Sequence, residues 1–193
     1  KLSKHIDTIA QAEGLEIHAK SVMVRAGCDW DIILISENNY KISEIIIDNS
    51  NSFRWSSIAE QERRSAVRDI LKSNYFKPLK IVKGPYKLHI KLIEWRLKLD
   101  IFYEKNDKSL KTISVSLTGI RRIIRDYQIV CDNYYEAIKT APLKKIEAID
   151  VGRKAIHNEG AEALKDLFYN YVDTDIETAR RIFTLICVIS LKL

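Results

Sequence analysis

The rest of the chain is organised around the stretch IEAIDVGRKAIHNEG, which spans residues 146–160. Its apolar residues continue at helical spacing to residue 171, so one stripe of a long helix is expected to face a core. A second face carries polar residues three or four positions apart, namely Glu147, Asp150, Lys154 and His157. This stretch therefore predicts a core helix and the densest polar cluster of the chain.

A second long helix is expected to come before it, capped by Thr118 and keeping apolar residues at helical spacing to Ile138. The first turns of this helix are basic, with Arg121, Arg122 and Arg125. Positive charge at a helix N-terminus opposes the macrodipole and costs roughly a few tenths of a kcal/mol per residue. The arginines therefore predict an anionic partner, which is either an acidic group of this chain, such as Glu147 or Asp150, or an external anion.

Together the two helices offer a candidate site for a ligand or a partner, made of Arg121, Arg122, Arg125, Asp150, Arg153, His157, Asn158 and Glu159. Asp150 and His157 lie about two helical turns apart on one face. A carboxylate near an imidazole raises its pKa and fixes its tautomer, as general acid–base chemistry requires. The sequence places no serine or cysteine beside His157 as a nucleophile and has no glycine-rich phosphate loop. We therefore assign no catalytic residue.

The same residues also have a purely structural interpretation. In that interpretation Asp150, Arg153, Arg122 and Glu159 form a buried ion-pair network that joins the two helices, while His157 and Asn158 hydrogen-bond a neighbouring turn. Such networks set the registry of helices without any reaction. The sequence leaves the functional and the structural interpretation open.

The hydrophobic period changes to two after residue 85. Residues 86–92, 96–103 and 112–117 alternate, which predicts three antiparallel strands with one apolar face and with His89 on the solvated face. Residues 40–47 predict a fourth strand. Between the first two alternating segments, Glu94-Trp95 is a poor turn because neither residue adopts positive φ at low cost.

Two further helices begin at capping-box patterns, SIAE at residues 57–60 and TDIE at residues 174–177. Pro142 opens the helix around residues 146–160. The last helix is apolar on nearly all sides over Ile182–Ile189, so we expect its end to be buried in the core or in a dimer contact. The predicted fold is α+β, with a small antiparallel sheet of about four strands covered by one early helix and three C-terminal helices.

The charge of the 193-residue chain is concentrated in one segment. The formal net charge is +6, and residues 77–111 carry ten basic residues against four acidic ones. A basic sheet face attracts phosphate whatever the base sequence, so a nucleic-acid-binding module whose affinity falls steeply with salt is one alternative function. Lysine that alternates with apolar residues also keeps an exposed strand soluble. Of the interleaved aromatic residues typical of a single-strand binder, only Trp95 and Phe102 are present.

The three cysteines, Cys28, Cys131 and Cys187, are too far apart in sequence for a disulfide framework or a C-x-x-C metal motif. We interpret Cys131 and Cys187 as small core residues and expect a reduced, cytoplasmic protein. No apolar run is long enough to span a membrane, so no membrane partner is expected. The sequence indicates no cofactor.

Several blocks of the sequence resemble one known family. They are GPY at residues 84–86, RRIIRDY at 121–127, IEAID at 146–150, IHNEG at 156–160 and TARRIFTLIC at 178–187. Residues from about 40 to 193 resemble uncharacterised protein family 0262 of alphaproteobacteria. This resemblance implies no reaction, cofactor or partner.

A second resemblance covers about the first 25 residues. The stretch QAEGLEIHAKSV at residues 11–22 is similar to the C-terminal tail of histidinol dehydrogenase, in which an E-G-L-x-x-H sequence supplies a zinc-ligand histidine. That resemblance would make His18 a metal ligand and the chain a fragment of a zinc- and NAD-dependent enzyme, inactive because the remaining metal ligands and the dinucleotide-binding region are missing. Residues 1–39 are thus expected to be a tail remnant and linker, and residues 40–193 a single domain.

Three functions follow from these observations. The first is a non-catalytic binding or regulatory module, in which the arginine and histidine cluster engages an acidic protein or a small anionic ligand, with a homo-oligomer as a further expectation. The second is the nucleic-acid-binding module. The third is a hydrolase-like enzyme built on Asp150 and His157, which lacks a nucleophile.

Overall fold

The computed structural model describes residues 19–26, 29–36, 40–48, 56–81, 84–104 and 108–191. The chain divides into two compact units, residues 1–39 and residues 40–193. In the first unit, β1 (Ala19–Ala26) and β2 (Asp29–Ser36) pair in antiparallel register. Residues 29–36 therefore form a strand and not the expected linker. His18, the expected metal ligand, lies outside the described residues.

The second unit contains a four-stranded sheet in the order β3-β5-β6-β7. Its strands are β3 (Ile42–Ile47), β5 (Tyr86–Ile93), β6 (Arg96–Tyr103) and β7 (Ser109–Ser116). The antiparallel pairing of β5, β6 and β7 is confirmed, but β3 pairs with β5 in parallel, so the sheet is mixed. A helix lies between β3 and β5 in sequence, and a helical crossover returns the chain to the sheet in the same direction.

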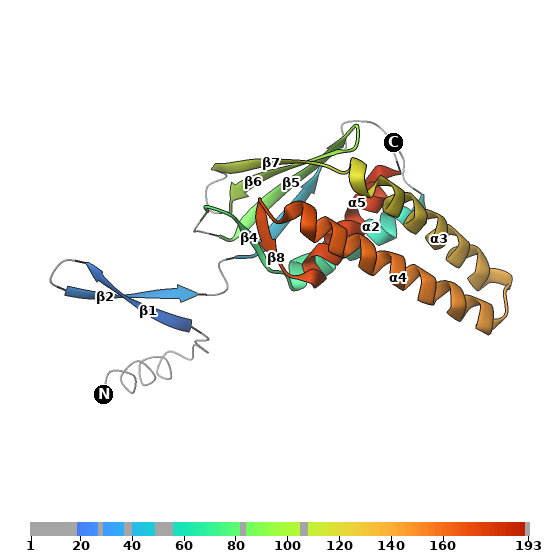
Figure 1. The fold of residues 1–193 in the computed structure, drawn as a ribbon, viewed down its shortest axis with the longest axis horizontal. Helices are drawn as coiled ribbons and strands as arrows, with labels where there is room; N and C mark the ends of the chain where they lie inside the picture. The colour runs from blue at the N-terminus through green and yellow to red at the C-terminus, as the bar shows by residue number, and fades with distance from the viewer. Residues whose placement is uncertain are drawn as a thin grey trace. The chain divides into compact units, whose positions relative to one another are not determined.

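The described residues form four α-helices, one early and three C-terminal, as predicted. They are α2 (Ser57–Lys72), α3 (Arg121–Thr140), α4 (Leu143–Phe168) and α5 (Ile176–Ser190). Two short strands, β4 (Phe76–Pro78) and β8 (Val172–Thr174), form a separate antiparallel pair. In Figure 1 α3 and α4 run side by side as a long hairpin that projects past α2 and α5.

The helix starts differ from the prediction by one to three residues. Ser56 caps α2, because its Oγ accepts a hydrogen bond from the Ala59 amide at 3.2 Å. Asp175 caps α5 by accepting from the Thr178 amide at 2.6 Å. The Thr174 hydroxyl instead donates to the carbonyl of Tyr75. Thr118 begins a 3₁₀ turn, η2 (Thr118–Ile120), and α3 starts after it without a side-chain cap.

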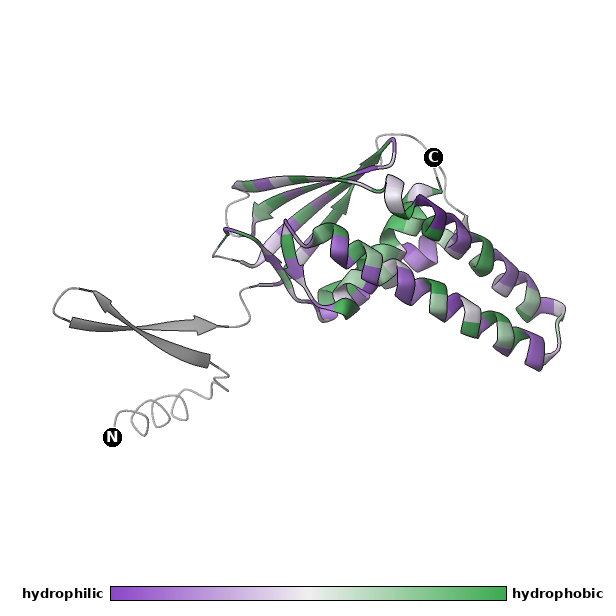
Figure 2. Cartoon of the chain, in the orientation of Figure 1, coloured by the Kyte–Doolittle hydropathy of each residue, from purple (hydrophilic) through white to green (hydrophobic). Residues whose placement is uncertain are grey.

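The core lies between the apolar face of the sheet and α5. Leu88, Ile90, Leu97, Leu99 and Ile101 alternate inward along β5 and β6 and are fully buried, and Figure 2 shows the matching alternation of apolar and polar residues along the strands. Ten of the fifteen residues of α5 are buried. The apolar end of this helix therefore lies in the core, which is the first of the two predicted alternatives.

The turn between β5 and β6 uses the two residues that the sequence disfavoured. Glu94 has φ of 46° and Trp95 has φ of 61°, in the left-handed region that costs non-glycine residues roughly 1–2 kcal/mol each. Trp95 gains contacts that offset this cost. Its carbonyl accepts from the Leu117 amide at 2.7 Å, and its ring packs against the core.

The close approach of α4 to α5 depends on Gly160. A Cβ at this position would overlap the ring of Phe183, whereas a Cβ at Gly152 of the same helix would meet nothing within 4 Å. Phe183 is fully buried. We therefore expect Gly160→Ala to destabilise the protein by about 1–3 kcal/mol through overpacking. Gly152→Ala should stabilise it by about 1 kcal/mol, because alanine is the better helix former.

The measurement is the free energy of unfolding from urea denaturation of both variants and the wild type. A stabilising Gly160→Ala would show that Phe183 has room to move and that this contact does not set the helix spacing.

Candidate functional site

The three arginines at the start of α3 find partners other than the expected acidic groups. The guanidinium carbon of Arg121 lies 4.7 Å from the ring centroid of Trp95, and that of Arg125 lies 5.8 Å from it. Such cation–π contacts are worth roughly 0.5–1 kcal/mol at exposed sites. Arg122 is exposed and faces Asp126 of its own helix, with Nε 3.6 Å from Oδ2. Neither Glu147 nor Asp150 takes part.

Asp150 forms ion pairs within α4. Its carboxylate lies 2.6 Å from Arg153 and 2.8 Å from Lys154. Hydrogen bonds from Lys154 and Arg153 hold the pKa of Asp150 below its ordinary value. The Arg153 guanidinium also lies over the ring of Tyr134, 5.1 Å from its centroid. Asp150 therefore pairs with Arg153, as in the structural interpretation, and not with the imidazole of His157, as the acid–base interpretation requires.

His157 is instead part of the contact between α3, α4 and α5. Its ring stacks on Tyr127 at a centroid distance of 4.8 Å and an interplanar angle of 16°. Its Nε2 lies 2.8 Å from the Thr184 hydroxyl, and that hydroxyl donates to the carbonyl of Arg180 at 3.2 Å. Because a hydroxyl has one proton, His157 Nε2 is the donor to Thr184. This bond fixes the neutral tautomer.

The pKa of His157 moves in the opposite direction to the one that the acid–base interpretation requires. Burial is the largest cause and the positive charges of Arg180 and Arg153 add to it, so that the pKa falls to about 4. The imidazole is therefore uncharged near neutral pH, and no carboxylate holds it in position for general acid–base chemistry.

The eight candidate residues do not gather at one place. Asn158 accepts a hydrogen bond from Arg180 of α5 at 3.1 Å, and Glu159 is exposed. Arg153 meets Tyr134, which lies twelve residues beyond Arg122 on α3, a separation of about 18 Å. The expected ion-pair network between the two helices does not form. The hydrogen bonds of His157 and Asn158 to a neighbouring element do form, and that element is α5.

The open face of the sheet carries lysines that are already paired. Lys91 lies 2.7 Å from Asp48, Lys87 3.3 Å from Glu44 and Lys98 3.0 Å from Asp100. His89 is half-buried and packs on Phe102 with ring centroids 4.5 Å apart. The positive charge that suggested nucleic acid is thus partly neutralised on this face.

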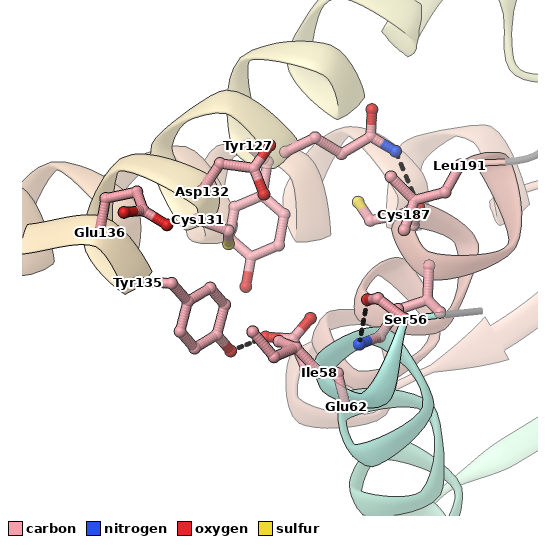
Figure 3. A pocket seen from close by; sticks show the side chains of 13 residues that line it. Ser56, Ile58, Glu62, Tyr127, Cys131, Asp132, Tyr135, Glu136, Cys187 and Leu191 are labelled. Carbon is pink, nitrogen blue, oxygen red and sulfur yellow. Dashed lines mark hydrogen bonds between the residues drawn. The ribbon is translucent and has the colours of Figure 1, made fainter. Parts of the chain in front are cut away.

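A pocket that the sequence analysis missed lies where α2, α3 and the end of α5 meet (Figure 3). It has a volume of about 220 Å³. The residues that line it are Ser56, Ile58, Ala59, Glu62, Tyr127, Gln128, Cys131, Asp132, Tyr135, Glu136, Cys187, Val188 and Leu191. It combines an apolar wall with a few polar groups, the composition typical of small-ligand sites.

Glu62 and Tyr135 meet at one side of this pocket. The Tyr135 hydroxyl donates a short hydrogen bond to the Glu62 carboxylate, and Figure 3 shows the Tyr127 hydroxyl directed toward the same space. Two further carboxylates, Asp132 and Glu136, lie on the α3 side. No lysine or arginine of the described chain lines the pocket.

The two cysteines of the pocket are buried thiols. Burial raises the pKa of Cys131 to about 11 and raises that of Cys187 well above its ordinary value. Both therefore stay protonated at neutral pH and are poor nucleophiles. Their sequence-based interpretation as small core residues agrees with their burial but missed the cavity beside them.

Among the described residues, no three histidine, cysteine, aspartate or glutamate side chains are placed so that they could hold one metal ion. The helices within the described ranges are too short or too polar to span a bilayer.

The sequence profile of uncharacterised protein family UPF0262 matches residues 39–192. The chain belongs to this family. A UPF0262 protein of Agrobacterium fabrum is 40% identical over 155 residues, which cover 80% of this chain and 98% of that protein. One of Caulobacter vibrioides is 41% identical over 151 residues, covering 78% and 93%. One of Maricaulis maris is 39% identical over 155 residues, covering 80% and 96%.

No solved structure matches the chain. The UPF0262 match begins at residue 39, and nothing in the comparisons supports the expected resemblance of the first 25 residues to histidinol dehydrogenase. The predicted family of residues 40–193 is confirmed, and all these relatives come from alphaproteobacteria.

The low pKa of His157 makes the stability of this UPF0262 protein depend on pH. The pKa is about 4 in the folded state and about 6.5 in an unfolded chain, so between these values the unfolded state binds more protons. Stability should therefore rise with pH from about 4 to about 6.5 and should lose this contribution below pH 4. His157→Gln keeps a donor for Thr184 and should flatten the dependence in that window.

The check is the urea midpoint of the wild type and of His157→Gln between pH 4 and pH 7. His89→Gln, on the open face of the sheet, controls for the loss of an imidazole as such. Parallel curves for wild type and His157→Gln would mean that His157 is protonated equally well in the folded protein.

Proposed function

We propose that this UPF0262 protein is a non-catalytic, cytoplasmic binding module that holds a small ligand in the pocket between α2, α3 and α5. The observation that carries the proposal is the pocket itself, a space of about 220 Å³ lined by aromatic rings, thiols, apolar side chains and carboxylates. This volume is smaller than the roughly 300–1,000 Å³ of pockets for drug-sized ligands. The ligand is accordingly small.

The side chains of the pocket support binding more than catalysis. Burial raises the pKa of Tyr127, and burial together with the bond to Glu62 raises that of Tyr135. With both thiols protonated as well, the pocket presents hydroxyl and thiol groups that do not ionise near neutral pH. Covalent catalysis needs a nucleophile activated by a base or by a lowered pKa, and these groups have raised values.

The sequence-based predictions that the structure leaves untested are separate from this pocket. Arg121 and Arg125 lie against Trp95, Arg122 lies beside Asp126, and the three remain a predicted contact for an acidic partner. The dehydrogenase-like tail remains a prediction for residues 1–25. Neither prediction contributes a residue to the pocket.

The pocket can be tested by filling it. Ile58 lies at its rim and is 42% exposed, and Ile93 has a similar exposure of 49% at the β5–β6 turn, outside the pocket. Ile58→Trp should occupy the space without disturbing the core, and Ile93→Trp is the matched control. A screen of small molecules by ligand-observed NMR should find compounds whose binding is lost in Ile58→Trp and kept in Ile93→Trp.

Binding that survives in both variants would place the site elsewhere on the molecule. A screen without any binder that distinguishes the two variants would overturn the proposed function.

A further inference from the structure

We propose that the ligand of this pocket is a small organic amine, a protonated nitrogen carried on an apolar body. This inference rests on the proposed function and adds to it the chemical class of the ligand. It reverses the sign of the charge that the sequence predicted, because the earlier expectation of an anionic ligand relied on arginines that lie outside the pocket.

The charge of the pocket lining favours a cationic ligand. Three carboxylates, Glu62, Asp132 and Glu136, line the pocket, and it has no basic residue of the described chain. Glu136 has a cationic neighbour in Lys139, at 2.7 Å, and both side chains are exposed. Glu62 and Asp132 are therefore the carboxylates available to a ligand. This region is acidic in a chain whose net charge is +6, so it favours cations against the overall field of the protein.

The carboxylate of Glu62 is held in position and can still accept hydrogen bonds. Tyr135 holds its carboxylate through one oxygen, and an ionised carboxylate has about four acceptor positions. The remaining positions can accept hydrogen bonds from an ammonium group. Such charge-assisted bonds are about twice as strong as bonds between neutral groups.

An apolar wall lies opposite these groups. Val188 and Leu191 line the pocket from the end of α5, together with the buried thiol of Cys187. Figure 3 shows Leu191 and Cys187 across the space from Tyr135 and Glu62. A ligand with an apolar body covers this wall while its charged nitrogen reaches the carboxylate. A fully hydrated inorganic cation leaves the wall exposed.

A metal ion fits the same groups less well. A bound transition metal needs three or four protein ligands, and no three such side chains among the described residues are placed to hold one ion. The protonated thiols and the carboxylates beside the apolar wall are suited to a hydrogen-bonding cation with an organic body.

Three probes with the same aromatic body and different head groups test the inference, namely 2-phenylethylamine, 2-phenylethanol and 3-phenylpropionate. Their affinities for the full chain are measured by ligand-observed NMR titration near pH 7. The amine should bind about ten-fold tighter than the alcohol, the size of one charge-assisted hydrogen bond, and the carboxylate should bind more weakly than the alcohol.

Two substitutions then locate the effect. Glu62→Gln keeps an acceptor for Tyr135 and should lower the affinity for the amine about ten-fold, leaving that for the alcohol unchanged. Asp132→Asn should have a smaller effect in the same direction. Glu147→Gln removes an exposed carboxylate of α4 outside the pocket and should change neither affinity.

The outcomes separate this inference from the proposed function. Equal binding of amine and alcohol, lost on Ile58→Trp, would overturn the amine and keep the pocket. Tighter binding of 3-phenylpropionate would also overturn the amine. Preference for the amine that persists in Glu62→Gln and Ile58→Trp would show a cation site elsewhere and overturn the inference, and binding of no probe would overturn it as well.

Discussion

The packing of Phe183 against the backbone of Gly160 is the contact on which the helical layer depends. Only a residue without a side chain allows α4 to approach α5 this closely, because any Cβ would occupy the space of the ring. Around it, Tyr127 and His157 complete an aromatic cluster, with their ring centroids 5.7 and 5.9 Å from that of Phe183. The three C-terminal helices therefore meet at one point, and the burial of His157 is a consequence of this contact.

The position of the pocket follows from the same arrangement. The aromatic cluster holds α3 against α5 through Tyr127, and α2 packs against α5 as well. Where α5 ends at Ser190 and α2 begins at Ser57, the hydrogen bond of Tyr135 to Glu62 joins α3 to α2 beside an unfilled space. The cavity occupies this space. The carboxylates of the cavity come from α2 and α3, and contacts outside the cavity set the distance between these two helices.

Much of the fold was evident from the sequence, because period-two alternation in β5 to β7 and helical spacing in α2 to α5 are local signals. The parallel pairing of β3 was not, since a single strand carries no mark of its neighbour's direction. The N-caps of α2 and α5 were predicted one residue away from their observed positions. Ser56 and Asp175 stand next to Ser57 and Thr174, which fit the capping-box pattern.

The candidate site was harder to predict than the fold. Helical spacing correctly placed Asp150 and His157 on one helix but did not show that Arg153 and Lys154 would take the carboxylate. The pocket lining comes from three segments separated by more than fifty residues, from Glu62 to Cys131 and from Cys131 to Cys187. Tertiary proximity of this kind leaves no periodic signal in a single sequence.

The length of the α3–α4 hairpin has a consequence for local stability. Beyond Gly160, α5 contacts α4 through the hydrogen bonds of Thr184 to His157 and of Arg180 to Asn158. From there α3 and α4 continue to Thr140 and Leu143. At that end Ile138 and Leu143 are 49% and 69% exposed, although both have apolar side chains. The far turns are therefore held mainly by each other and open at a lower free energy than the core, so amide hydrogen exchange should slow progressively from Thr140 back toward Tyr127.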